Sequence, residues 1–342
     1  MHAILHGMRN EDLLLDLIKI NSESGNEKEI GDFIFNLLTE KGFQVEKQIV
    51  DEKAGTFNIF ASVGKPKVVF SNHMDTVPPQ IEVKEEDGKI YGRGACDAKS
   101  QLAAALCAAF LAREKDLTDF GLAYTIQEEL DLLGAEKILD ILPDGVELIV
   151  AGEPTELELV RGHNGIICFE LLAHGKTAHG ALPEKGINAI ELLMEDLTVI
   201  RNTDFGEDKI LGKNILNIAQ ISGGIADNVV PDEAKAIISF RTVSDFEKVI
   251  EKLKSVVKGE VKITLKYNPF FNDKAEDLAK KIGIKTKTVR YFTEASILRQ
   301  KGNPVILGAG SIKEAHSATE FVSIAEYNKL IELYLEIIKQ YN

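Results

Sequence analysis

Residues 68–75 read Val-Val-Phe-Ser-Asn-His-Met-Asp, an apolar run that ends in a histidine and an aspartate. Three other short apolar runs, at residues 57–63, 122–126 and 146–151, are typical of buried strands. Residues 100–115 are rich in alanine, and their length and composition predict a buried helix. Because such strands alternate with helices, we predict an α/β fold with a mixed, mostly parallel sheet that is flanked by helices.

The middle of the chain has a different pattern. Loose alternation predicts strands at residues 166–173, 215–222, 233–242 and 261–266, and helical spacing predicts helices at residues 188–201 and 244–257. A chain of 342 residues is long enough for two domains. We therefore predict an α/β domain formed by residues 1–160 and 269–342, interrupted by a small inserted α+β domain at residues 161–268. Ser323 and Glu326 have the spacing of a capping box, which predicts the start of the last helix.

Composition excludes several classes of protein. The chain has 40 basic and 54 acidic residues and a formal net charge of −14, whereas nucleic-acid binding needs a basic surplus. Residues 91–99 and 175–177 resemble nucleotide-binding loops only in part, because Asp97 and Glu170 stand where glycines are required. The three cysteines form no Cys-x-x-Cys pair, which argues against a thiolate zinc site. We expect neither a nucleic-acid partner nor a nucleotide cofactor.

The sequence shows no sign of a membrane partner. No run of about 18 apolar residues occurs, so no membrane span is expected. Residues 1–9 lack the apolar core of a signal peptide, and two acidic residues follow closely. We therefore expect a cytoplasmic protein.

Six side chains come at the expected strand ends or in the loops that follow them: His73, Asp97, Glu128, Glu129, Glu153 and His316. Each alone also fits an ordinary role, such as a hydrogen-bonded loop histidine, a helix cap or a solvated surface acid. Together, two imidazoles and three carboxylates suit two divalent zinc-like ions, one carboxylate bridging them. Of the adjacent pair Glu128 and Glu129, one can bind metal while the other acts as general base. Cobalt or manganese also fits such ligands.

These motifs, in this order, resemble those of a known family. They are His73-Met-Asp75-Thr-Val-Pro, the segment 87–99, Glu128-Glu129, Gly152-Glu153-Pro-Thr and His316. The family is that of the di-zinc amidohydrolases, which includes acetylornithine deacetylase, succinyl-diaminopimelate desuccinylase, aminoacylase and glutamate carboxypeptidase. The resemblance extends over nearly the whole chain, and it implies hydrolysis of an amide bond.

The resemblance also implies a role for each residue of the site. His73 and Glu153 would bind one zinc ion, Glu129 and His316 the other, and Asp97 would bridge the two. Glu128 would be the general base that takes a proton from water and passes it to the leaving amine. Asp75 would orient His73.

The inserted domain resembles the lid of this family, which also forms the dimer interface, so we expect a homodimer. Residues 176–190 match a motif whose histidine, here His179, reaches the substrate from the partner subunit in relatives. Asn228 and Arg241 match lid residues that contact the substrate, and a guanidinium suits its α-carboxylate. The alternatives are an exposed turn for His179 and a surface ion pair for Arg241.

Within the family, the closest likeness is to acetylornithine deacetylase, through the segments 291–295 and 307–316 and the residues around Glu153. Glu294 would then attract a cationic substrate side chain such as the amine of ornithine. A shortened segment after Pro79 leaves open a desuccinylase, an acyl-lysine or acyl-citrulline deacylase, or a metallo-dipeptidase. A catalytically inactive binding protein is the alternative from another class.

Overall fold

The computed structural model describes residues 9–342, and its contacts divide the chain into two compact units. The first unit comprises the chain up to Arg161 together with residues 272–287 and 293–342, and the second comprises residues 162–271 and 288–292. The short segment 288–292 therefore belongs with the second unit, although the sequence indicated one continuous insertion. Residues 1–8, which contribute to the predictions of the first domain and of the absent signal peptide, lie outside the described residues.

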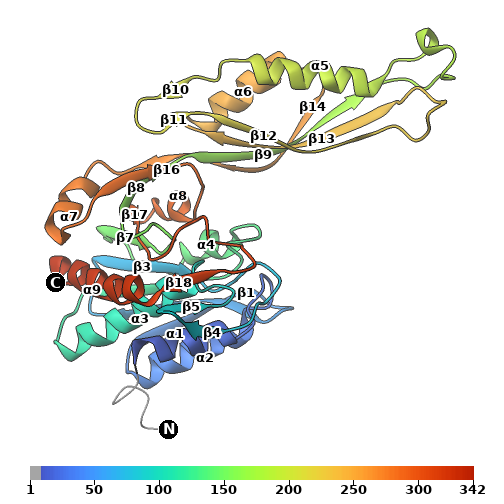
Figure 1. The fold of residues 1–342 in the computed structure, drawn as a ribbon. Coiled ribbons are helices and arrows are strands. Elements are labelled where there is room, and N and C mark those ends of the chain that lie inside the picture. Colours follow the sequence, from blue (N-terminus) through green and yellow to red (C-terminus); the bar gives the residue numbers. More distant parts are fainter. Residues whose placement is uncertain (1–8) are drawn as a thin grey trace. The chain divides into compact units, whose positions relative to one another are not determined.

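A large mixed sheet has the strand order β1-β2-β6-β3-β7-β17-β8-β15, with β16 also paired to β8 (Figure 1). Its strands are β1 (Gln44–Asp51), β2 (Thr56–Val63), β3 (Val68–His73), β6 (Phe120–Thr125), β7 (Leu148–Ala151), β8 (Leu159–His163), β15 (Phe270–Phe271), β16 (Thr286–Val289) and β17 (Asn303–Ile306). The mixed α/β class is confirmed. The central strands β6, β3, β7 and β17 pair in parallel, whereas β1, β2 and β6 pair antiparallel, as does β8 with β17 and β15. The short turn from β1 to β2 permits only antiparallel pairing.

Helices pack against this sheet and bury its apolar strands. They are α1 (Asn10–Lys19), α2 (Lys28–Glu40), α3 (Lys99–Glu114), α4 (Leu133–Ile138), α7 (Ala275–Ile282), α8 (Ala295–Leu298) and α9 (Ile324–Tyr341). Nearly every residue of α3 is buried, in agreement with the alanine-rich helix expected there. The small side chains of α3 let α9 pack closely, and Tyr334 of α9 donates a hydrogen bond to the Leu307 carbonyl at 2.6 Å. The sheet is thereby fixed from one side by buried helices.

A small sheet joins two segments that are far apart in the sequence. It consists of β4 (Lys84–Glu86), β5 (Lys89–Tyr91) and β18 (Phe321–Ser323), in the order β18-β5-β4. Tyr91 pairs with Phe321 across the antiparallel β5–β18 contact. Because the loop with Asp97 follows β5 and the loop with His316 precedes β18, this pairing holds the bases of both loops together.

The second unit is an antiparallel sheet covered on one face by two helices (Figure 1). Its elements are β9 (Gly165–His174), the 3-10 turn η1 (Pro183–Lys185), α5 (Ala189–Asn202), β10 (Glu207–Asp208), β11 (Gly212–Lys213), β12 (Ile215–Gly223), β13 (Glu233–Thr242), α6 (Phe246–Val256) and β14 (Glu260–Tyr267). The sheet order is β12-β13-β9-β14, and apolar residues that alternate along β9 and β13 pack under α5 and α6. Between Arg9 and Asn342, no helix combines the length and the apolar character that crossing a membrane requires.

Candidate metal centre

His73 is the last residue of the buried central strand β3, which directs its side chain to the carboxyl end of the parallel strands. Its Nδ1 atom lies 3.0 Å from the Asp75 carbonyl oxygen and 3.4 Å from Asp75 Oδ1, and its Nε2 atom lies 3.1 Å from Asp97 Oδ1. Burial lowers the pKa of His73, but the hydrogen bonds to Asp75 and Asp97 outweigh it and hold the pKa well above its usual value. The neighbours on both nitrogens fix the ring orientation.

Asp97 lies between two imidazoles. It precedes α3, is 6% exposed, and directs Oδ1 to His73 and Oδ2 to His316, whose Nε2 atom is 3.4 Å away. Burial opposes ionisation, but hydrogen bonds from His316 and His73 keep the pKa of Asp97 below its usual value. An ionised carboxylate with one oxygen toward each imidazole has the arrangement that a ligand shared by two cations requires.

Glu128 and Glu129 follow β6 in a tight turn that begins at Gln127, whose φ is 57°. The carboxylate of Asp75 accepts the backbone N–H of Glu128 at 3.0 Å and that of Glu129 at 3.1 Å. Glu129 Oε1 lies 2.6 Å from His316 Nε2, whereas ligand atoms of Glu128 gather with those of His73 and Glu153. The two adjacent carboxylates thus point in different directions, Glu129 toward His316 and Glu128 toward His73 and Glu153.

Glu153 follows β7 and is 5% exposed. Its position depends on Gly152, where a Cβ would lie 1.7 Å from the Asn72 side-chain nitrogen. Burial, together with the charges of Asp97 and Glu128, raises the pKa of Glu153 well above its usual value. Burial and neighbouring carboxylates likewise raise the pKa of Glu128.

His316 lies in the loop between β17 and β18, and its side chain is 47% exposed. Its hydrogen bonds with Asp97 and Glu129 raise its pKa to about 10. The raised pKa values of His73 and His316 reflect the negative charge of the crowded carboxylates. Bound cations offset the same charge, and they bind such groups in their deprotonated forms.

The donor set therefore fits divalent cations. Within residues 9–342, the groups of nearby potential ligands are His73 with Asp97 and Glu129, and His73 with Glu128 and Glu153. Imidazole and carboxylate are ligands that zinc prefers, and manganese and cobalt accept them as well. The structure brings together all five predicted ligands and the predicted base.

Glu294 lies elsewhere than the sequence suggested. It is 1% exposed at the start of α8, and its carboxylate accepts hydrogen bonds from the hydroxyl groups of Ser71 and Thr125. Burial raises its pKa. Because both oxygens are engaged and hidden from solvent, this placement differs from the expectation that Glu294 contacts a cationic substrate. The carboxyl group supports strands β3 and β6 below the site.

The remaining predicted residues belong to the second unit. His179 forms a bridge pair with Val229, and the next residue, Gly180, donates its N–H to the Asn228 carbonyl at 2.7 Å. The structure therefore brings His179 and Asn228 together. Arg241 lies on β13, opposite Ile166 of β9.

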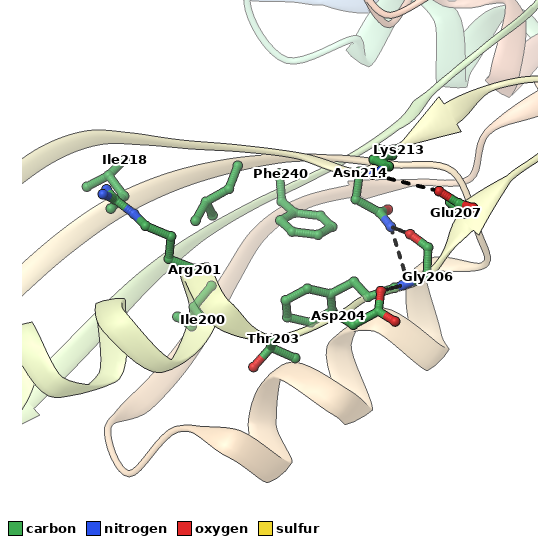
Figure 2. Close-up of a pocket in the computed structure, with 12 residues that line it drawn as sticks. Ile200, Arg201, Thr203, Asp204, Gly206, Glu207, Lys213, Asn214, Ile218 and Phe240 are labelled. Carbon is green, nitrogen blue, oxygen red and sulfur yellow. Dashed lines mark hydrogen bonds and ion pairs between the residues drawn. The ribbon is translucent and has the colours of Figure 1, made fainter.

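The second unit also contains a pocket of about 650 Å³ between the end of α5, the β10–β11 hairpin and the sheet (Figure 2). The rings of Phe205 and Phe240 meet edge to face there, with their centroids 5.0 Å apart. Asn214 closes one end by donating to the carbonyls of Phe205 and Gly206. None of the described residues that line this pocket is a predicted site residue.

Sequence reasoning missed three residues that support the centre. Ser24 donates to Asp75 Oδ2 at 2.7 Å, and Glu27 accepts the backbone N–H of Gln127 at 3.2 Å. Glu320 accepts the N–H of Asp97 at 3.1 Å. Each is remote in sequence from its partner, so spacing alone gave no signal for it.

Known proteins resemble this chain in sequence and in fold. Residues 69–340 match the model of peptidase family M20/M25/M40. A peptidase M20 domain-containing protein of Schizosaccharomyces pombe is 35% identical over 321 residues, covering 91% of this chain and 79% of that protein. A probable carboxypeptidase of Talaromyces marneffei is 33% identical over 402 residues, covering 99% and 88% of the two chains. The crystal structure of a tripeptidase from Staphylococcus aureus has a TM-score of 0.83 and 28% identity, and the match covers 97% of each chain. The chain therefore belongs to peptidase family M20/M25/M40 and is a hydrolase of amide bonds.

Proposed function

We propose that the protein is a two-metal amidohydrolase that cleaves the amide bond of a small N-acyl amino acid, in the manner of acetylornithine deacetylase. The observation that carries the proposal is the position of Asp97. Its two oxygens face His73 and His316 at 3.1 and 3.4 Å, and Glu128 lies on the His73 side of the same centre. The remaining ligands on the two sides are Glu153 and Glu129.

The residues define where two ions would be held. His73 and Glu153 would hold one, Glu129 and His316 the other, and Asp97 would be shared. When bound, two divalent ions such as Zn²⁺, or Co²⁺ or Mn²⁺, supply the Lewis acidity that activates water and polarises an amide carbonyl. Asp75 orients His73 through its contact with the Nδ1 atom of the ring, and this contact also favours one tautomer of the ring.

Glu128 would move the proton. The Asp75 carboxylate accepts its backbone N–H, and its ligand atoms gather with those of His73 and Glu153, beside the position proposed for one ion. Its carboxylate takes the proton from the attacking water and delivers it to the nitrogen of the leaving amine. The carbon–nitrogen bond then breaks, and a carboxylic acid and a free amino group are released.

A short peptide is the second candidate substrate. The relatives are described as a probable carboxypeptidase and a tripeptidase, so peptide bonds are cleaved on this scaffold elsewhere in the family. The chemistry at the amide is the same for both substrate classes. Glu294, which was expected to attract the amine of ornithine, is buried, so a preference for an ornithine side chain is supported by the sequence likeness alone.

The first test is amine release from a panel of N-acetyl, N-succinyl and N-formyl amino acids, dipeptides and tripeptides. We expect turnover of N-acetylornithine or a close analogue by zinc-loaded protein. Chelation should abolish the activity, because the carboxylates alone cannot stabilise the negative charge that develops on the amide oxygen. Re-addition of Zn²⁺, Co²⁺ or Mn²⁺ should restore it.

The panel separates the alternatives. Turnover of peptides alone would support the same mechanism but would show that short peptides, rather than N-acyl amino acids, are the substrates. Turnover of succinyl-diaminopimelate alone would place the protein with the desuccinylases. If protein that demonstrably binds metal hydrolyses nothing on the panel, the proposal gives way to a non-catalytic binding function.

We further propose a homodimer in which His179 acts in the partner's site, with Asn228 and Arg241 as substrate contacts. The family resemblance supports this, as does the exposure of Met194, Ile221 and other large apolar residues in the second unit. A mixture of His179→Ala and Glu128→Gln subunits, each nearly inactive alone, should regain about a quarter of wild-type activity. Half of randomly formed dimers are mixed, and each of these has one complete site. If the subunits demonstrably exchange between dimers and the mixture regains no activity, His179 acts in the site of its own subunit.

A further inference from the structure

Glu320 is a fully buried carboxylate four residues after His316, just before β18. Its Oε1 atom accepts the backbone N–H groups of Cys96 and Asp97 at 2.9 and 3.1 Å. It therefore connects the end of the His316 loop to the backbone of the residue that lies between the two imidazoles. None of the predicted roles includes this contact.

Arg93 completes the connection. It is 2% exposed, and its Nη1 atom donates to Glu320 Oε2 at 2.7 Å and to the Ser317 carbonyl at 3.1 Å. Its Nε atom donates to the Pro79 carbonyl at 3.1 Å. The guanidinium thus joins three segments, and Ser317 is the immediate neighbour of His316.

The partners of Glu320 are all hydrogen-bond donors. One oxygen faces two backbone N–H groups and the other faces a guanidinium. Only an ionised carboxylate satisfies this set, because a glutamine amide has a single oxygen and would turn its NH₂ group toward a donor. A buried ion pair is costly to assemble and contributes little net stability compared with apolar packing. Its position between the two loops therefore suggests a role other than stability.

We propose that Glu320, with Arg93, is a positioning residue that sets the distance between Asp97 and His316 and so fixes the metal pair in place. This inference rests on the proposed function. The Asp97 side chain extends from a backbone that Glu320 holds, and His316 extends from a loop that Arg93 holds through Ser317. Loss of the hydrogen bonds that Glu320 and Arg93 make to these two loops lets the 3.4 Å separation between Asp97 Oδ2 and His316 Nε2 vary. Metal affinity falls when residues that orient ligands are lost.

The test is a calorimetric titration of metal-free protein with Zn²⁺, with Co²⁺ absorption spectra as a second readout. For Glu320→Gln we expect Kd for at least one ion to rise by about 10–100-fold, the range typical of residues that orient metal ligands. The visible absorption of the Co²⁺ form should change in intensity, because it reports ligand geometry. Glu320→Asp, which keeps the charge on a shorter stem, should recover part of the affinity.

Asp196→Asn is the matched control. Asp196 is 2% exposed and accepts the consecutive backbone N–H groups of Lys258 and Gly259 at 2.9 and 2.7 Å. It lies in the second unit, whereas the five predicted ligands belong to the first. Asp196→Asn should lower the melting temperature and leave both metal Kd values unchanged. The comparison separates a loss of general stability from a loss of ligand position.

Wild-type Kd values and an unaltered Co²⁺ spectrum in Glu320→Gln would overturn the inference while leaving the proposed function intact. Wild-type protein that binds fewer than two ions would overturn both. If Glu320→Gln does not fold, the titration is made with Arg93→Lys, which keeps the charge but cannot reach three acceptors. It should weaken metal binding in the same direction, and unchanged binding would overturn the inference.

Discussion

Glu128→Gln is expected to lower kcat by about 10²–10⁴-fold, the contribution typical of a positioned general acid–base. The amide has nearly the shape of the carboxylate, so the turn held by Asp75 should persist, because the Asp75 bonds go to the backbone N–H groups of residues 128 and 129. The amide cannot accept the proton of the attacking water or deliver it to the leaving nitrogen. The reaction then relies on bulk water for both transfers.

The measurement is kcat and KM on the best substrate of the panel, with metal content determined on the same samples. We expect two ions per chain and a KM close to wild type, because the predicted ligands remain in place. Glu114→Gln, at the exposed end of α3, is the matched control and should behave as wild type. A Glu128→Gln protein with two bound ions and undiminished kcat would exclude Glu128 as the base.

Asp97→Asn is expected to remove the paired metal site. The asparagine side chain has only one oxygen, so it can bind the ion on the His73 side or the ion on the His316 side but not both. The amide also carries no negative charge to offset two cations. We expect the affinity for one of the ions to fall by more than the roughly 10–100-fold that loss of an outer residue costs. Activity should fall with it, because the chemistry needs both ions.

Calorimetry of metal-free protein and metal analysis after dialysis measure this effect. Asp277→Asn removes the same charge from an 80% exposed side chain on α7 and should leave binding unchanged. Two ions bound with wild-type affinity by Asp97→Asn would show that Asp97 is not the shared ligand. In that case, the centre would have to be rebuilt around Glu128, Glu129 and Glu153.

The sequence was informative where one local pattern decides the structure. The apolar run before His73 could be buried only as a strand between neighbours, and it forms β3 at residues 68–73. The alanine-rich segment forms α3 within one residue of the predicted bounds. Strand ends in parallel sheets converge at one edge, so residues that follow different strands meet, as His73, Glu128 and Glu153 do.

The sequence was uninformative where a side chain can bond either to a neighbour in the sequence or to a distant residue. Helix α9 does begin directly after Ser323, as the capping-box spacing predicted, but the Ser323 side chain makes no cap, and Glu326 accepts the N–H of Gly310 instead. Glu294 follows a plausible pocket motif, but it turns inward to Ser71 and Thr125. The direction of a side chain depends on what the fold places beside it, and a local sequence pattern does not reveal those neighbours.

The paired strands β8 and β15 have a consequence for how the gene of this protein can be rearranged. Gly162 pairs with Phe271 and His163 with Phe270, so the chain leaves for the second unit and returns from it at neighbouring points. A segment whose two ends are neighbours can be inserted or removed without rerouting the rest of the chain. The same adjacency means that residues 162–271 can be replaced as one genetic segment, with only residues 288–292 of the second unit encoded elsewhere. Such an exchange would leave the genetic segments that encode the predicted metal ligands untouched.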